Sequence, residues 1–277
     1  MGRQDGPGGL VPQLARRSWA WQRQEALKLI RLLLNRAMDD GCLARNPAAR
    51  MDVGKLPRSK VKVLTPPKLD AIVAALPERW QAFVLVAAYA SPRWSELVAA
   101  KREDLVHDED RDRWTLRVDE KLVEVRGEWV WGEPKTEDSV REITLPAEAV
   151  RPLLAHLLRY PPLHDQADER LEGLVFYGEH GGPVRRHSFR KVWDRACTAA
   201  GVEGVRPGWL RHTGASLAYA ATHDLKGVAE RLGHTSTRMV DTVYVRTYEG
   251  ASRDLADAID ALVGASRDRD GTTTGPR

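Results

Sequence analysis

The 277-residue sequence contains only two cysteines and no long apolar run. Cys42 and Cys197 stand far apart and outside any CxxC spacing, so the sequence contains neither a zinc motif nor a disulfide framework. We therefore expect both to be buried thiols of a reducing cytoplasm. No apolar stretch reaches the roughly 18 residues of a membrane-spanning helix, and the first residues lack a signal-peptide pattern. These absences argue against a membrane or secreted protein.

Positive charge is concentrated at the start of the chain. The net charge is +4, but residues 1–62 contain 13 Lys and Arg against 5 Asp and Glu, which leaves the rest of the chain net negative. A basic segment favours a polyanionic partner, of which DNA is the simplest. A solvated surface would have the same composition, so charge alone does not decide between the two.

Apolar periodicity predicts a mainly α fold with a small antiparallel β-sheet. A first helix is expected over 21–40, where Gly41 and then Asn46-Pro47 end it in a turn. Alternating residues predict three strands, at 114–118, 129–131 and 140–145. A turn is expected at 135–139, between the last two strands. The remaining helices are expected at 68–76, 78–90, 93–101, 147–158, 188–200, 210–221, 225–232, 238–244 and 251–263.

Five side chains of the kinds that act on phosphate occur in short motifs. Arg93 lies in RWSEL and Arg211 in WLRHT, each at the start of a predicted helix. Lys135 lies in PKT, and His234, in LGH, precedes Tyr244 by ten residues. Guanidinium groups donate paired hydrogen bonds to phosphate oxygens and stay charged at every relevant pH. Two fixed cations, a histidine, a lysine and a phenol can together break and rejoin a phosphodiester without metal.

Each of these residues also has an ordinary interpretation. Arg93 would form an exposed helical ion pair with Glu96 at i,i+3, and a lysine in a turn, such as Lys135, is usually solvated. Tyr244 would be an amphipathic surface residue at a helix end. The ordered spacing from Arg211 to Tyr244 favours one shared site over these separate explanations.

The ordered set resembles the tyrosine recombinases, the phage integrase family. The resemblance extends over residues 21–264 and is most specific at 85–100 and 205–250. It implies a catalytic domain at 63–264, mainly α with a small antiparallel sheet. Residues 21–62 would then be a partial core-binding helical segment and a basic linker.

Two segments are expected to be disordered, the start of the chain at 1–20 and the polar tail at 265–277. The helices that precede the last core-binding helix in the family are not apparent in the sequence. Relative to the family, we therefore expect a truncated N-terminus.

The resemblance implies a role for each of the five side chains. Tyr244 would attack the phosphodiester, forming a 3′-phosphotyrosine and releasing a 5′-hydroxyl. Arg93 and Arg211 would bind the non-bridging oxygens, to which His234 would also donate a hydrogen bond. Lys135 would protonate the leaving 5′ oxygen. Neither a metal nor another cofactor is implied, because the phosphotyrosine conserves the bond energy for religation.

Two assignments have competitors. Tyr248 is near enough in sequence to replace Tyr244 as the nucleophile, although it matches the family spacing less well. Lys121, in the same predicted sheet, is the alternative to Lys135 as the general acid.

The sequence departs from the family at Gly208. Family members commonly have a histidine three residues before the second arginine, here Arg211, and glycine has no proton to give or take. His212 follows Arg211 but points about 100° further around the helix, so it is not a simple replacement. Loss of one acid–base group typically costs about 10²–10⁴ in rate. The chain is therefore expected to be a site-specific recombinase or, alternatively, a catalytically impaired or dead DNA-binding remnant.

Double-stranded DNA is the expected partner, with a homotetramer assembled on paired sites and accessory DNA-bending proteins as further partners. Basic side chains expected to contact DNA are Arg17, Arg31, Arg36, Arg185, Arg186 and Arg190. A type IB topoisomerase, which shares this chemistry as a monomer, is a third interpretation of the same residues.

Overall fold

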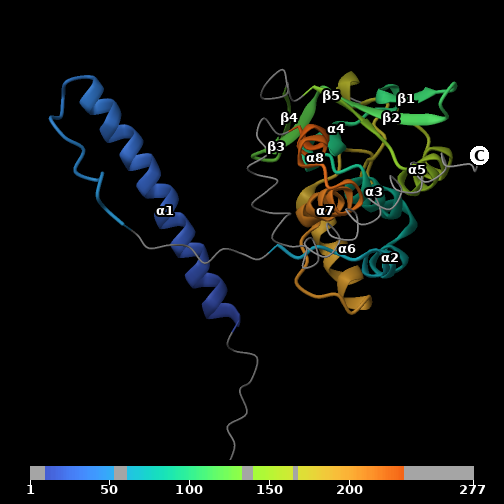
Figure 1. Cartoon of the computed structure of the whole chain (residues 1–277), viewed down its shortest axis with the longest axis horizontal. Coiled ribbons are helices and arrows are strands. Elements are labelled where there is room, and N and C mark those ends of the chain that lie inside the picture. The colour runs from blue at the N-terminus through green and yellow to red at the C-terminus, as the bar shows by residue number, and fades with distance from the viewer. Residues whose placement is uncertain (1–9, 53–60, 133–139, 165–167, 234–277) are drawn as a thin grey trace, which may run out of the picture. The chain divides into compact units, whose positions relative to one another are not determined.

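The computed structural model of the chain describes residues 10–52, 61–132, 140–164 and 168–233 (Figure 1). The chain divides into two compact units, Met1–Lys60 and Val61–Arg277. This division falls inside the predicted basic linker. Within the described part of the chain, no helix combines the length and the apolar character needed to cross a membrane.

The first unit consists of one long helix and the turn that follows it. α1 spans Leu10–Asp39, so it begins well before the predicted start at residue 21. Pro12 falls in the first turn, where a missing N–H costs no hydrogen bond within the helix, so this proline does not stop it. Residues 10–20 are therefore helical, which corrects the predicted disorder of that part of the chain.

The turn after α1 folds back against the helix. Gly41 has φ 75°, the left-handed conformation that commonly ends a helix. Asn46 then donates from Nδ2 to the carbonyl of Arg31 at 3.2 Å, and its Oδ1 accepts the backbone N–H of Ala48 at 2.8 Å. The prediction that Cys42 is buried was wrong, because this short turn leaves its side chain exposed.

The second unit contains the remaining helices and all the described strands. Its helices are α2 (Pro66–Ala75), α3 (Glu78–Tyr89), α4 (Trp94–Ala99), α5 (Ala147–Arg159), α6 (Arg186–Ala199), α7 (Leu210–Thr222) and α8 (Leu225–Leu232). Its strands are β1 (Leu105–Asp108), β2 (Arg113–Val118), β3 (Lys121–Val125), β4 (Glu128–Gly132) and β5 (Arg141–Thr144). Every helix and strand predicted within the described residues is present to within a few residues, whereas β1 and β3 were not predicted. The helices predicted at 238–244 and 251–263 lie outside the described residues.

The strands form two antiparallel sheets, not the single sheet that the sequence predicted. One sheet has the order β1-β2-β5, and β3 and β4 form a separate hairpin. The predicted strand at 129–131 belongs to β4 and therefore pairs with β3, and the segment between β4 and β5 joins two sheets. The last three residues of β3 are all exposed, although two of them are valines. Apolar residues therefore do not mark a buried face of this strand, and the sequence pattern did not predict it.

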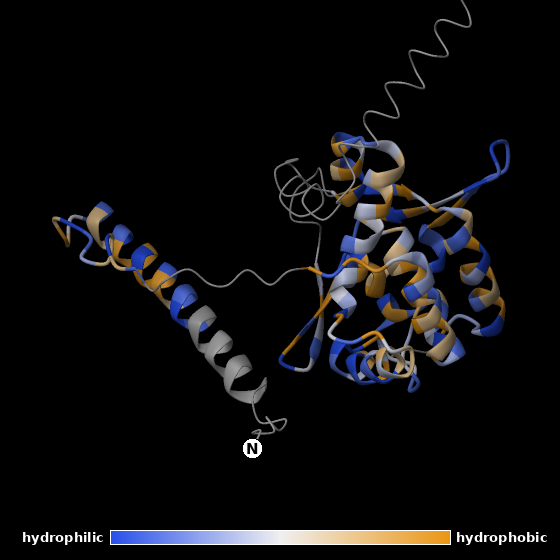
Figure 2. Ribbon diagram, turned by 60° about the horizontal axis from the view of Figure 1, so that its bottom comes forward, coloured by the Kyte–Doolittle hydropathy of each residue, from blue (hydrophilic) through white to orange (hydrophobic). Residues whose placement is uncertain are grey.

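Helix α3 lies at the centre of the hydrophobic core. Its Phe83 packs edge-on against Trp94 of α4 and against Phe176, in each case with ring centroids 5.2 Å apart. Figure 2 shows hydrophobic residues recurring along the helices of this unit. Cys197 of α6 is buried as predicted, and burial raises the pKa of its thiol to about 11. It is therefore an uncharged core residue.

A close crossing of α3 and α7 positions the next part of the molecule. A Cβ atom at Gly214 of α7 would lie 1.8 Å from the carbonyl oxygen of Ala88 and 2.1 Å from Oγ of Ser91. Only glycine permits this approach. The start of α7, which carries Arg211, is thereby held beside the end of α3.

Candidate active site

Arg93 stands at the N-cap of α4 and contacts two elements. Its backbone N–H donates to Oε2 of Glu96 and its Nη1 donates to Oε1, both at 2.7 Å, so the predicted i,i+3 ion pair is present. Its Nη2 also donates to the carbonyl of Gly233 at 2.8 Å, at the C-terminal end of α8. The side chain remains 39% exposed, so the guanidinium is still accessible to a ligand.

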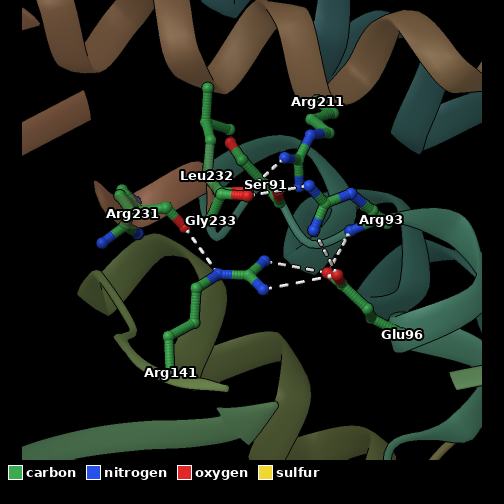
Figure 3. Close-up of polar contacts among 8 residues, drawn as sticks. All are labelled: Ser91, Arg93, Glu96, Arg141, Arg211, Arg231, Leu232 and Gly233. Atoms are coloured by element: carbon green, nitrogen blue, oxygen red, sulfur yellow. Dashed lines mark hydrogen bonds and ion pairs between the residues drawn. The ribbon is translucent and has the colours of Figure 1, made fainter. Parts of the chain in front are cut away.

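Arg211 meets Arg93 at the same helix end (Figure 3). As the second residue of α7, it donates from Nη1 to the carbonyl of Ser91 at 2.7 Å and from Nη2 to the carbonyl of Leu232. Ser91 is buried and has φ 61°, a conformation that non-glycine residues rarely adopt. The two guanidiniums thus bind consecutive carbonyls, those of Leu232 and Gly233, and both point into one region.

A buried carboxylate, Glu96, joins Arg93 to a third arginine, Arg141 (Figure 3). Glu96 accepts hydrogen bonds from Arg93 and, at 2.8 and 3.3 Å, from both terminal nitrogens of Arg141 in β5. Burial alone would raise the pKa of Glu96, but the hydrogen bonds and charge of Arg141, followed by the bonds from Arg93, outweigh it and lower the pKa to about 2. Glu96 is therefore ionised at neutral pH, and its charge is shared between two guanidiniums.

A groove of about 930 Å³ borders this cluster and is lined by Arg93, Gly208 and residues of α6 and the β3–β4 hairpin. Arginines stack on tryptophans along it, with Arg186 5.3 Å from the ring centroid of Trp94 and Arg206 6.0 Å from that of Trp209. A groove that combines exposed cations with aromatic faces suits a phosphate backbone and its bases.

Comparison with known proteins identifies the family. The family model of the phage integrases matches residues 62–250, which is more than half of the chain and contains the whole arginine cluster. The chain belongs to the phage integrase family. Its relatives include proteins named integrases and tyrosine recombinases.

Two mycobacterial relatives illustrate the likeness. The integrase of Mycobacterium phage L5 is 28% identical over 264 residues, which cover 93% of this chain and 69% of that protein. The putative prophage phiRv2 integrase of Mycobacterium tuberculosis (strain ATCC 25618 / H37Rv) is 28% identical over 244 residues, 87% of this chain and 62% of that protein. The chain thus spans about two thirds of the length of these integrases.

Solved structures share the fold. The Tn1549 transposon integrase, in complex with a circular intermediate DNA, superposes with a TM-score of 0.73 at 16% identity, covering 88% of this chain and 84% of that one. The XerA recombinase superposes with a TM-score of 0.53 at 20% identity, covering 71% and 64%. At these identities the likeness establishes the tyrosine recombinase fold and leaves the roles of single residues to the geometry.

Three of the predicted catalytic residues lie outside the described residues: Lys135, His234 and Tyr244. The same holds for Tyr248, the competing nucleophile. Gly233 is the last described residue before His234, so the arginine cluster adjoins the point where that segment begins. The catalytic roles of these residues outside the described part of the chain stay predictions.

Lys121, the alternative general acid, is described. It lies in β3, opposite Gly132 in the register of the hairpin. Its side chain runs across that residue, because a Cβ atom at Gly132 would lie 2.9 Å from Cε of Lys121. Lys121 does not appear among the described residues that line the groove.

The position that departs from the integrase pattern is open. Gly208 lies in the short 3₁₀ turn Pro207–Trp209 and lines the groove, and a Cβ atom built there would meet nothing within 4 Å. A side chain at this position would therefore begin in open space beside the groove. The neighbouring His212 is half-buried, and its pKa is lowered by burial and by the charge of Arg211. His212 is therefore neutral at neutral pH.

Most of the arginines predicted to bind DNA have partners within the protein. Arg31 donates from Nε to the carbonyl of Ala48 at 3.0 Å, so it helps to hold the turn after α1. Arg36 pairs at 3.2 Å with Asp40, the residue that follows α1. Arg17 lies in α1, where only the backbone is described. DNA contact by these three residues stays a prediction.

The three arginines predicted at the start of α6 are all exposed. Arg185 pairs with Glu124 and lies over the ring of Trp129, and Arg190 pairs with Asp194 at 2.7 Å. Because surface ion pairs of this kind contribute little, a phosphate can replace the carboxylates. Their contact with DNA also stays a prediction.

Sequence reasoning missed Arg141 as a member of the site. One feature of the strand indicates it: Arg141 and Ile143 share a face of β5, and Ile143 is fully buried. An arginine on the buried face of a strand requires a carboxylate. The structure supplies Glu96, which the sequence had assigned only to Arg93.

Proposed function

We propose that the chain is a site-specific DNA recombinase that cuts and rejoins double-stranded DNA through a 3′-phosphotyrosyl intermediate. The observation that carries the proposal is the meeting of Arg93 and Arg211 at the end of α8, directly before His234. Their guanidiniums bind the two non-bridging oxygens of the scissile phosphate. His234 donates a further hydrogen bond to the same phosphate, whose charge grows as the nucleophile attacks.

The bonds broken and formed balance without a nucleotide cofactor. The phenol of Tyr244 gives up its proton to water as its oxygen attacks phosphorus, the bond to the 5′ oxygen breaks, and Lys135 gives that oxygen a proton. A 5′-hydroxyl then attacks the phosphotyrosine and restores the diester. The excess of positive charge around Glu96 supplies the electrostatic stabilisation that a metal supplies in other phosphoryl transferases.

The partners follow from the reaction. Two exchanged duplexes require four cleavages, so we expect a homotetramer on paired DNA sites, assisted by accessory DNA-bending proteins. The exposed arginines of the groove hold the phosphate backbone. We expect the protein to act in the cytoplasm, where its DNA substrate is.

Trapping the covalent intermediate tests the proposal. The full chain is incubated with sheared genomic DNA that carries its gene, the mixture is denatured in detergent, and DNA that remains linked to protein is sequenced. A nicked duplex of the recovered sequence then traps the intermediate. Tyr244→Phe should abolish the adduct and Tyr248→Phe should leave it. The absence of any adduct with wild-type protein contradicts the proposed reaction, and the reverse pattern moves the nucleophile to Tyr248.

A second candidate function, that of an impaired DNA-binding relative, is favoured by the glycine at position 208. Because a Cβ atom there meets nothing within 4 Å, Gly208→His is the variant that restores the missing group. If the chain is an impaired recombinase, the variant should form adduct about 10²-fold faster than wild type. Gly208→Gln is the matched control of similar size, with no group that titrates. Equal rates for wild type and Gly208→His would show that the protein works without this histidine.

A further inference from the structure

Arg141 lies apart from the motifs that carry the proposed catalytic residues. It is the first residue of β5, six residues after Lys135 in the chain, and its side chain is only 8% exposed. Burying a guanidinium is costly unless each of its N–H groups finds a partner. Its contacts therefore indicate what the fold uses it for.

The partners of Arg141 belong to two different catalytic segments (Figure 3). Nη2 and Nη1 donate to Glu96 of α4 at 2.8 and 3.3 Å. Nε donates to the carbonyl of Arg231 at 3.0 Å, at the end of α8. A planar guanidinium holds such bonds at fixed angles, which a lysine cannot do. Arg141 thus links the helix that begins at Arg93 to the helix that ends before His234.

These contacts close a ring. Three consecutive carbonyls at the end of α8 accept hydrogen bonds from three arginines: Arg231 from Arg141, Leu232 from Arg211, and Gly233 from Arg93. Arg93 and Arg141 are joined in turn through Glu96. Removal of Arg141 opens the ring on the side where β5 supports it.

Packing reinforces the hydrogen bonds. A Cβ atom at Gly233 would lie 3.0 Å from Nη1 of Arg141 and 3.2 Å from Cζ, so the guanidinium lies against the backbone of that residue. Gly233 also has φ 61°, which favours glycine. The residue that precedes His234 is therefore held by Arg141 on one side and by Arg93 through its carbonyl.

Charge gives Arg141 a second effect. Glu96 carries one negative charge, and its bidentate bond to Arg141 offsets that charge at close range. The positive charge of Arg93 is then left for a phosphate in the groove. Without Arg141, Glu96 would cancel Arg93, the residue that the proposed reaction needs as a cation.

We infer that Arg141 is a positioning residue of the recombination reaction, which holds Arg93 and the end of α8 in register and keeps Arg93 available for the scissile phosphate. The inference rests on the proposed function for its effect on rate. Its structural part, the tethering of α8, stands without it.

Arg141→Gln and Arg141→Lys test the inference in the full chain. The matched control is Arg117→Gln, which removes an arginine on the adjacent strand β2 that pairs with Asp119 at 2.9 Å and is 52% exposed. The first readout is the single-turnover rate of adduct formation at saturating nicked DNA, with the Kd for the same DNA measured in parallel. The second is hydrogen exchange of residues 225–233 without DNA.

Arg141→Gln should lower the rate about 10²-fold, as misplacement of a catalytic group by about 1 Å does, while Kd changes less than about threefold. Arg141→Lys keeps the positive charge but not the planar guanidinium, and it should lower the rate of adduct formation about tenfold. In both variants residues 225–233 should exchange faster than in Arg117→Gln, which should resemble wild type.

The outcomes separate the inference from the proposed function. If wild type forms no adduct, the proposed function fails, and exchange at 225–233 still decides whether Arg141 tethers α8. Equal rates or equal exchange in Arg141→Gln and Arg117→Gln overturn the inference. So does a parallel loss of rate and DNA affinity in Arg141→Lys, because that pattern belongs to a general loss of structure.

Discussion

The catalytic unit contains two groups of arginines that are held in opposite ways. Arg93, Arg141 and Arg211 are fixed by one buried carboxylate and by carbonyls at the end of α8. The other arginines along the groove, such as Arg186 and Arg190, lie over tryptophans or pair with exposed carboxylates on their own helix. The first arrangement fixes each guanidinium through buried partners, and the second leaves side chains free to adjust to a bound molecule.

This difference separates rate from affinity. A transition state is stabilised only by donors that are already in place, so the fixed group should govern the rate of strand cleavage. Adjustable surface cations neutralise phosphates wherever these lie, so the groove arginines should govern affinity and its dependence on salt.

The largest effect is expected at Arg211. Arg211→Ala should lower the single-turnover rate of adduct formation about 10²–10³-fold, because it removes a fixed donor to the charge that develops on the phosphate. Arg186→Ala, from the groove, should stay within about threefold at saturating DNA. Similar losses in the two variants would remove the distinction between the groups.

Acid should weaken the fixed group through Glu96. Its pKa is lowered from 4.5 to about 2, so its ionised form stabilises the fold above about pH 4.5, and this contribution is lost as pH falls towards 2. The contribution is about 3 kcal/mol. Glu96→Gln should be less stable than wild type to urea at pH 6, and the gap should narrow below pH 4.5 and close near pH 2.

Glu148→Gln is the control for that measurement. Its carboxylate pairs with Arg151 on the surface of α5, where both side chains are largely exposed. Its difference from wild type should be small and nearly constant with pH. A gap for Glu96→Gln that is equally constant would mean that its charge does not hold the cluster together.

The helix crossing that carries Arg211 should tolerate no added atom. Gly214→Ala places a Cβ atom 1.8 Å from a backbone oxygen of α3, so it should lower the free energy of unfolding by about 2 kcal/mol. Gly208→Ala meets nothing within 4 Å and should change stability by less than about 0.5 kcal/mol. Denaturant unfolding of both variants measures the contrast, and equal stabilities would show that α3 and α7 can separate without loss.

The smallest effect is expected in the groove. Arg186→Gln should reduce the slope of log Kd against log salt by about 0.9, because one fewer phosphate is neutralised. Arg151→Gln, on the exposed face of α5, should leave the slope unchanged. Binding isotherms at several salt concentrations give both slopes. An unchanged slope for Arg186→Gln would place the DNA elsewhere.

Periodicity was enough to predict most helices of the second unit, because each buries one apolar face. α5 is an example, with Ala149 and Leu153 buried at helical spacing. Periodicity was not enough for β3, whose exposed valines mark no buried face, or for the pairing of β4 with β3. β3 and β4 pair across the short turn Arg126-Gly127, so this pairing was missed because β3 itself was missed. The pairing of β2 with β5 joins segments far apart in the chain, which local pattern does not connect.

The residues of the candidate site likewise fall into those that local sequence predicts and those that only long-range contacts define. Motifs predicted Arg93 and Arg211, because each lies in a short and distinctive sequence at a helix start. The role of Arg141 depends on a carboxylate 45 residues away and on a carbonyl 90 residues away, which no local motif records. The need for glycine at 214 likewise appears only where two helices cross.

The most direct test of the account removes charge from the DNA instead of from the protein. If Arg93 and Arg211 act on the scissile phosphate, replacing that phosphate by a neutral methylphosphonate in the nicked duplex should make them nearly dispensable. The loss caused by Arg93→Ala or Arg211→Ala should then shrink from about 10²–10³-fold to within about tenfold. An undiminished loss in both variants would contradict the claim that these guanidiniums face one phosphate.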